Sequence, residues 1–312
     1  MMNKHINQEL LYGVYSKSFL IITIILITLF SVIIFMNYNA VIDKYHDYTW
    51  TLMSFEGNET AIEKALAGEF HVEKQGNITH VKNPLLYHKV MTERYMYTAS
   101  PEYMHLQLLE SSIVFNPIVF GLLGLIFATY DKKFKTIKIK TVRISKKNFS
   151  IIKQISLAIS SLLIFISALA ISYIIAVGVY YRLLNIVPLS NFVTDVSLVN
   201  ISSIFTKLIF AYIIALLFVQ IGYILGVIFK NRIVGIMALM LYVYILPAFG
   251  KYDLYNSIKL VSLRVFDFYG VVRISQITET TLFNAIIIIM TVFLITIITS
   301  TIITSKRSSF NP

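Results

Sequence analysis

Histidine is the residue type whose placement in this sequence most suggests chemistry, because five of the six histidines fall within residues 38–111. His71, Glu73 and His80 flank a Gly-Asn pair at 76–77, and a hairpin turning there would bring all three onto one face. Two imidazoles and a carboxylate suit a borderline divalent cation. The alternative is a solvated polar face, which we favour because no ligand spacing recurs among the remaining three: His46, His88 and His105. We therefore predict no metal site.

Sequence motifs for catalysis or nucleotide binding are missing from the chain. It contains no cysteine, no H-E-x-x-H, no G-x-S-x-G and no G-x-x-x-x-G-K-[ST]. We therefore predict that the protein is not an enzyme, has no catalytic residue and binds no cofactor itself. If it moves a substrate uphill, the energy must come from another polypeptide.

The composition argues for a membrane protein. Of the 312 residues, 57% are hydrophobic and 14% are charged, and the mean hydropathy is +0.73. A soluble domain carries about 25% charged residues, so a water-soluble globule is excluded. The net charge of +11 suggests a protein that binds nucleic acid. Most Lys and Arg residues, however, lie in short segments between apolar runs, as in membrane proteins. We expect an all-α polytopic fold whose partner is the lipid bilayer and not a nucleic acid.

Six apolar stretches approach or exceed the length that a helix needs to cross a hydrocarbon core of about 30 Å. None of them contains Asp, Glu, Lys, Arg or His. Proton- or cation-coupled transporters usually place such a group at mid-membrane, so we disfavour that class. The predicted spans are residues 19–37, 112–130, 154–181, 208–229, 233–249 and 283–305.

The distribution of basic residues orients the spans. Segment 131–153 holds nine Lys or Arg residues and a single acid, Asp131. Together with residues 1–18, 230–232 and 306–312, it would place 15 of the 27 basic residues on one side of the membrane. Because positively charged short segments remain inside, we predict a multi-pass protein of the cell membrane with both termini in the cytoplasm.

The N-terminal segment precedes the first predicted span. In residues 1–18, Ile6, Leu10 and Val14 recur every four positions, whereas Glu9 falls on a different face. This periodicity is typical of an amphipathic helix that lies at a membrane interface. We therefore expect an N-terminal interfacial helix with Glu9 away from its apolar side.

The loop at residues 38–111 is too long to be structureless in a compact protein. Residues 60–68 are rich in helix formers, and Gly76-Asn77 is a two-residue hairpin turn signal. That turn would fix the register by pairing Glu73 with His80. We expect a small extracellular α+β insertion between spans 1 and 2.

Three shorter patterns concern the bilayer and its surfaces. Residues 250–282 are semi-apolar with interrupting charges, which favours outer re-entrant or interfacial helices. Gly222 and Gly226 form a small-xxx-small pair that would let two helices approach closely, and the alternative is ordinary glycine enrichment in membrane helices. For segment 131–153 two interpretations stay open: a basic loop that sets topology and contacts anionic lipid, or a docking surface for a cytoplasmic partner.

The chain resembles the membrane subunits of ABC-2 type ATP-binding cassette exporters in three places. One is the entry helix with Glu9 and Lys17, and another is the semi-apolar stretch before the last span. The strongest is residues 121–153, where the family has an acid, a Thr-Ile/Leu-Lys step, a Ser-Arg/Lys step and a later Lys. Here these are Asp131, Thr136-Ile137-Lys138, Ser145-Lys146 and Lys153. The family acid is more often Glu, so Asp131 is a departure.

This resemblance implies the permease subunit of an ATP-driven exporter that moves amphipathic peptides or other membrane-active compounds. It also implies two partners: a second membrane subunit, identical or different, and a cytoplasmic ABC ATPase that carries the ATP and Mg. The alternative is a non-transporting sensor or immunity protein whose extracellular loop binds a peptide.

Segment 131–153 is the cytoplasmic segment long enough to present a helix to an ATPase, so we expect it to couple ATP hydrolysis to transport. A helix across residues 135–147 would align Phe134, Ile137 and either Val142 or Ile144 as an apolar ridge. Lysines on its flanks would set the register of the contact. Exposed ion pairs contribute only about 0.2–1 kcal/mol each, so affinity would depend on the ridge. The residues expected at this contact are Asp131, Phe134, Thr136, Ile137, Lys146 and Lys147.

Overall fold

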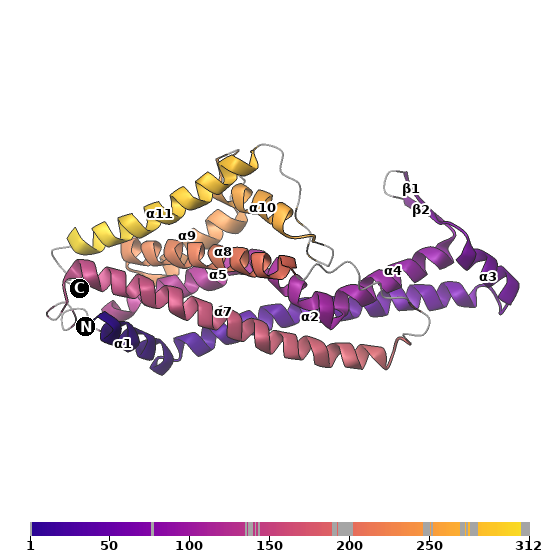
Figure 1. The fold of residues 1–312 in the computed structure, drawn as a ribbon, viewed down its shortest axis with the longest axis horizontal. Helices are drawn as coiled ribbons and strands as arrows, with labels where there is room; N and C mark the ends of the chain where they lie inside the picture. The colour runs from indigo at the N-terminus through magenta and orange to yellow at the C-terminus, as the bar shows by residue number, and fades with distance from the viewer. Residues whose placement is uncertain are drawn as a thin grey trace.

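The protein is an elongated, mainly helical molecule with a two-stranded hairpin near one end (Figure 1). It is known from a computed structural model. The described residues are 2–75, 78–134, 136, 140, 142, 144–188, 192, 202–245, 250, 252–268, 272, 274 and 280–306.

Five of the described helices are long and apolar enough to cross a membrane, judged by length and composition. Their exposed faces carry large apolar side chains such as Ile24 (53% exposed), Leu163 (60%) and Phe283 (73%). A water-soluble protein rarely exposes so much contiguous apolar surface, whereas hydrocarbon tails are a good solvent for it. The five helices are α2 (Ser18–Met53), α5 (Pro101–Lys133), α7 (Lys146–Leu184), α8 (Ser202–Phe229) and α11 (Leu282–Lys306).

The region predicted as the fifth span, residues 233–249, forms a shorter element. It contains α9 (Arg232–Met240) and a π-helical turn, η3 (Leu241–Ile245), and residues 246–249 lie outside the described residues. At about 1.5 Å per residue the two together extend roughly 21 Å, less than the roughly 30 Å of a hydrocarbon core. The prediction of six spans is therefore not confirmed.

One end of the molecule gathers α1 (Met2–Tyr15), the end of α5 and the starts of α7 and α9 (Figure 1). Arg232 Nε of α9 donates to Thr129 Oγ1 of α5 at 2.6 Å, and Gln154 Nε2 of α7 donates to Ser300 Oγ of α11 at 2.8 Å. The end of α11 therefore lies here as well. We call this the basic end, because segment 131–153 connects α5 to α7 there.

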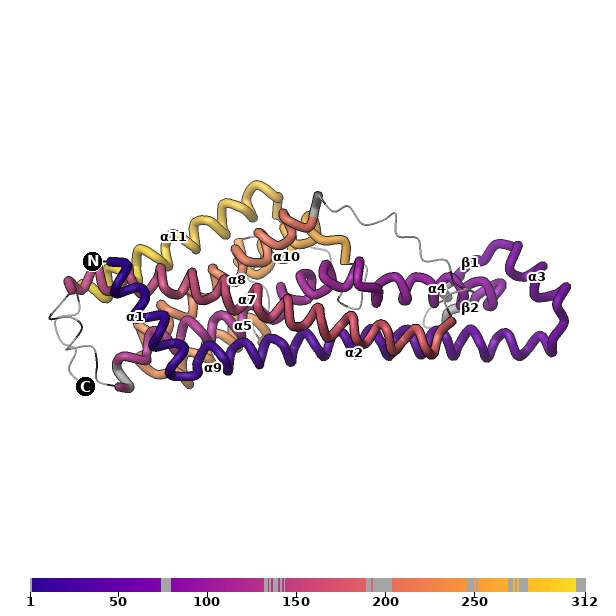
Figure 2. Tube along the Cα trace, turned by 60° about the horizontal axis from the view of Figure 1, so that its bottom comes forward, coloured from indigo at the N-terminus to yellow at the C-terminus, as the bar shows by residue number. Residues whose placement is uncertain are grey.

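The opposite end is an extension formed by α2, α4 (Pro84–Ala99) and the end of α7 (Figure 2). With 36 residues α2 is about 54 Å long, so a hydrocarbon core of about 30 Å cannot contain it. A separate apolar cluster that includes Val41, Leu85, Met96 and Leu183 holds the three helices together. At the tip lie α3 (Glu59–Ala67) and the hairpin.

The hairpin consists of β1 (His71–Gln75) and β2 (Ile78–Lys82), which pair antiparallel. Glu73 lies opposite His80, so the register predicted from the Gly-Asn turn is confirmed. That register follows from the two-residue connection, which leaves no freedom to slip the strands.

Helix α1 packs onto the bundle through a face that differs from the predicted one. Glu9 and Gly13 are buried together with Ile6, whereas Val14 is 58% exposed. A Cβ on Gly13 would lie 2.1 Å from the ring of Phe19, so this glycine lets α1 fold back against the start of α2. An ion pair described below draws the carboxylate of Glu9 inward, which the periodicity of the segment did not predict.

The tightest helix contact in the membrane region joins α5 and α8, which run parallel. A Cβ on Gly222 would lie 2.0 Å from the carbonyl oxygen of Gly121, and one on Gly124 would lie 2.1 Å from that of Val219. One turn further along α8, a Cβ on Gly226 would lie 2.6 Å from Cβ of Ala128. The two predicted glycines thus sit where backbone meets backbone, and the partner helix contributes its own Gly-x-x-Gly pair.

Candidate functional site: a buried ion cluster at the basic end

Four charged side chains meet where α1, α5 and α7 come together, and their exposed fractions lie between 2% and 14%. Lys140 Nζ is 2.8 Å from Asp131 Oδ1 and 2.5 Å from Glu9 Oε1. Lys153 pairs with the other oxygen of Asp131. We call these four residues the ion cluster, which contains two acids and two bases and is formally neutral.

Further hydrogen bonds complete the ion cluster. Thr136 Oγ1 donates to Asp131 Oδ1 at 2.6 Å, and Lys153 Nζ donates to the backbone oxygen of Phe127 at 2.7 Å. Lys140 Nζ also lies 4.4 Å from the centre of the Tyr12 ring, within range of a cation–π contact. A buried charge is tolerated only when such partners replace water, so these contacts are what allow the cluster to exist.

The ends of α5 and α7 position the two members of the ion cluster that these helices carry, Asp131 and Lys153. Asp131 lies in the last turn of α5, where the negative end of the helix dipole disfavours a carboxylate unless cations compensate. Ser145 caps α7 by accepting a hydrogen bond from the Asn148 backbone nitrogen at 3.3 Å. Lys153 then follows two turns inside α7, on the side that faces α5.

The six residues expected to contact an ATPase divide into two groups. Asp131 is buried in the ion cluster, and Thr136 is half-buried and donates to Asp131, so both are engaged within the protein. The others lie toward the surface or outside the described residues: Phe134 and Lys147 are exposed, Lys146 is half-buried, and Ile137 falls outside the described residues.

A continuous helix over residues 135–147 is not formed. Ser145 has an extended backbone (φ −58, ψ 146), which ends any helix before it and starts α7 at Lys146. Earlier in the segment, the backbone nitrogen of Lys140 donates to the Thr136 oxygen at 3.1 Å, and that of Ile144 to the Lys140 oxygen at 3.1 Å. The prediction of a continuous helix was wrong because Ser145 is a strong helix N-cap. Its hydroxyl accepts a hydrogen bond from the backbone nitrogen three residues later, so a new helix starts there.

Three members of the ion cluster were not predicted as site residues: Glu9, Lys140 and Lys153. Glu9 and Lys140 are 131 residues apart in sequence, and no local pattern connects them. Lys153 was noted only through the family resemblance. The available signal was a lone acid, Asp131, at the end of an apolar run beside nine bases, because such an acid must find a cation if it is buried.

Another buried carboxylate, Glu110, lies outside the ion cluster, within α5 toward the other end, and was also missed. Its Oε1 accepts from Tyr103 Oη at 3.1 Å and from the Phe268 backbone nitrogen at 3.2 Å. Nearby, Lys207 is 2.7 Å from Asp267, with its own side chain 5% exposed. Glu110 thus fastens the segment after α10 (Leu254–Val265) to α5.

Removing the carboxylate of Glu110 is expected to loosen this attachment. Glu110→Ala should lower the free energy of unfolding by about 1–3 kcal/mol, because the Phe268 nitrogen loses a buried acceptor. Glu110→Gln keeps one acceptor oxygen and should cost less than half as much. Unfolding of the two purified variants in mixed micelles measures the difference, and equal losses would contradict the assigned bonds.

The histidine-rich region shows no metal-binding group among the described residues, where no three His, Asp or Glu side chains converge. His71 lies 3.8 Å from Glu69, and Glu73 pairs with Lys82 across the hairpin at 3.2 Å. His88 is 3.9 Å from Asp47, and burial lowers the pKa of its imidazole while that carboxylate opposes the shift. The predicted absence of a metal site stays a prediction.

The long apolar helices and their exposed apolar faces are those of an α-helical multi-pass membrane protein. Comparison of the chain with family models, curated proteins and solved structures finds no match.

Proposed function

We propose that this chain is the membrane subunit of an ATP-driven exporter, energised by a separate cytoplasmic ATPase. The observation that supports this most is the ion cluster. Within it, Lys140 of segment 131–153 pairs with Glu9 of α1 and Asp131 of α5, and Asp131 in turn pairs with Lys153 of α7. A force applied to the segment would reach three helices through contacts that are short and buried.

The proposed orientation places the basic end in the cytoplasm, following the excess of Lys and Arg in segment 131–153. The extension formed by α2, α4 and α7, with its hairpin, would then stand outside the cell. The resemblance to ABC-2 exporters at Glu9, Asp131, Thr136 and Lys153 adds support, because all four residues belong to the ion cluster or bond to it. We further propose a second membrane subunit and an amphipathic, membrane-active substrate.

The proposed ATPase contact lies on the outer face of segment 131–153. Phe134 is 51% exposed and Val142 is 87% exposed, whereas Asp131 and Lys153 of the ion cluster are buried. Exposed apolar side chains of this kind are suited to anchoring in a groove, and buried apolar anchors dominate the affinity of most interfaces. The flanking lysines would orient the encounter.

Val142→Asp is expected to reduce the amount of ATPase that co-purifies with the tagged chain from its native membranes at least tenfold. A carboxylate placed in an apolar contact loses its hydration. The free-energy cost of that loss exceeds the 1.4 kcal/mol that a tenfold change in affinity requires. The measurement is quantitative mass spectrometry of the ATP-binding cassette protein in the purified complex, at matched membrane expression.

The matched control is Val72→Asp, which introduces the same charge at another exposed valine, 41% exposed on the hairpin at the opposite end. It should leave the yield of ATPase unchanged. If no ATP-binding cassette protein accompanies the wild-type chain, the exporter proposal fails and the sensor or immunity alternative gains. If the ATPase is present but both variants behave alike, docking on segment 131–153 is wrong.

A further inference from the structure

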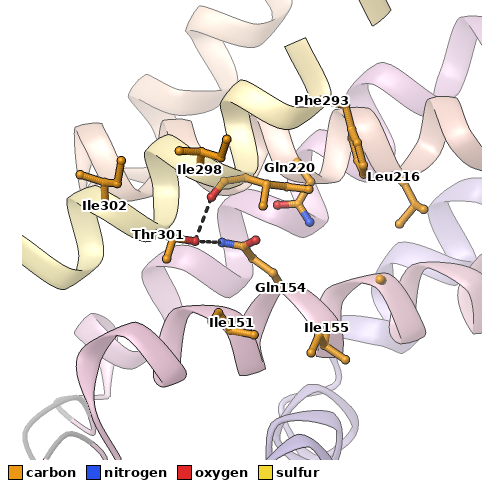
Figure 3. A pocket seen from close by; sticks show the side chains of 11 residues that line it. Ile151, Gln154, Ile155, Leu216, Gln220, Phe293, Ile298, Thr301 and Ile302 are labelled. Atoms are coloured by element: carbon orange, nitrogen blue, oxygen red, sulfur yellow. Dashed lines mark hydrogen bonds between the residues drawn. The ribbon is translucent and has the colours of Figure 1, made fainter. Parts of the chain in front are cut away.

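A groove of about 520 Å³ lies between α7, α8 and α11, in the half of the bundle nearer the basic end (Figure 3). Its walls are aliphatic and aromatic, with Ile155 from α7, Leu216 from α8 and Phe293 from α11. Ile298 and Ile302, which also line it, are 54% and 43% exposed, so the groove opens on the outside of the bundle. In a bilayer that opening faces lipid.

Two amide side chains interrupt the apolar walls. Gln154 Nε2 donates to Ser300 Oγ at 2.8 Å and to Thr301 Oγ1 at 3.0 Å, which joins α7 to α11. The bond to Thr301, which also lines the groove, is drawn in Figure 3. Gln220 projects from α8 and is 3% exposed. Its Oε1 has no hydrogen-bond partner within the part of the chain that the structure describes.

We infer that this groove binds one neutral, single-chain amphiphile whose head group donates a hydrogen bond to Gln220 Oε1. A buried acceptor without a partner costs about 1–3 kcal/mol, so a donor that reaches it gains that much over a purely apolar occupant. Every wall residue is uncharged, which disfavours an ionic head group. A hydroxyl or amide head on an alkyl chain satisfies both conditions.

The groove is too small to enclose a helix. A helix about 10 Å across would fit little more than one turn into 520 Å³, so neither a folded peptide nor a helix of a second subunit could be enclosed. The same volume falls within the roughly 300–1,000 Å³ of small-molecule sites. The opening toward lipid gives an alkyl chain a direct route from the bilayer.

The test uses two photoreactive probes in nanodiscs that contain the full chain: a 12-carbon alcohol with a diazirine near its methyl end, and its methyl ether. The ether has the same chain but no donor. We expect the alcohol to label the α11 stretch that includes Phe293 and Ile298 about fivefold more than the ether does. Cross-linked peptides are quantified by mass spectrometry.

Variants separate the hydrogen bond from the groove itself. Gln220→Leu should make alcohol and ether label equally, and Ala158→Phe, which fills the groove, should abolish labelling by both. The matched control is Ala170→Phe, at an exposed position further along α7, which should keep the wild-type ratio. Equal labelling by the two probes in the wild-type protein would overturn the inference, as would a preserved ratio in Gln220→Leu. No ATPase is needed, so this result is independent of the proposed function.

Discussion

Lys153→Met is expected to lower the free energy of unfolding by about 3 kcal/mol or more, the largest effect of any single charge removal in this protein. The substitution preserves the length of the side chain but leaves Asp131, 2% exposed, with Lys140 as its remaining cation. Removing one partner of a buried ion pair typically costs 3–5 kcal/mol, because the other charge remains desolvated. Equilibrium unfolding in mixed micelles measures the loss.

The control for Lys153 is Lys44→Met. Lys44 pairs with Asp47 at 2.7 Å, but the two side chains are 34% and 44% exposed. Water replaces the lost partner there, so the expected cost is below about 1 kcal/mol. Similar losses for Lys44→Met and Lys153→Met would contradict the buried character of the ion cluster.

A double variant distinguishes lost attraction from stranded charge. Adding Asp131→Leu to Lys153→Met removes the desolvated carboxylate, and Lys140 still has Glu9 at 2.5 Å. The double variant should therefore unfold at higher denaturant concentration than Lys153→Met alone, since replacing both partners of a buried pair is often close to neutral. A double variant less stable than either single one would show that the pair itself is strongly stabilising.

Gly222→Ala is the second change with a large expected effect, a loss of about 3 kcal/mol in the free energy of unfolding. Its Cβ would lie 2.0 Å from the oxygen and 2.7 Å from the carbon of the Gly121 carbonyl. These are backbone atoms of α5, so relief requires the two helices to separate along their contact. Overpacking of this kind reaches the upper part of the usual 1–3 kcal/mol range.

Gly178→Ala is the matched control for Gly222→Ala. Gly178 lies in α7, and a Cβ added there meets no atom within 4 Å. Alanine is a better helix former than glycine by about 1 kcal/mol, so this variant should be equal to the wild type or slightly more stable. A thermal unfolding series on both variants decides between them: the helix contact is misplaced if Gly222→Ala behaves like Gly178→Ala.

The sequence determined the class of protein and several local structures. Apolar runs longer than a bilayer is thick specify helices before any packing is known, because unpaired backbone groups are too costly in lipid. The hairpin register followed from a single Gly-Asn pair, because a two-residue turn allows only one alignment of the two strands. These are short-range effects, in which each residue acts on neighbours a few positions away.

Only the tertiary structure decided which charges are buried. Four charged residues lie one or two positions outside the predicted spans, where each seemed to mark the water boundary, and all four are at most 4% exposed: Glu110, Asp131, Lys153 and Lys207. The sequence located the apolar runs by excluding these residues. It could not show that helix ends from distant parts of the chain would meet and supply each charge with a partner.

Glu9 and Lys140 illustrate the physical reason. Periodicity placed Glu9 on a different face from Ile6, Leu10 and Val14, and a carboxylate alone prefers water. Its burial became favourable only once α1 packed against α5 and α7, which placed Lys140 at 2.5 Å and Tyr12 beside that ammonium. The face a helix buries is therefore set by the partners that its charged residues find, and those partners lie 131 residues away in the chain.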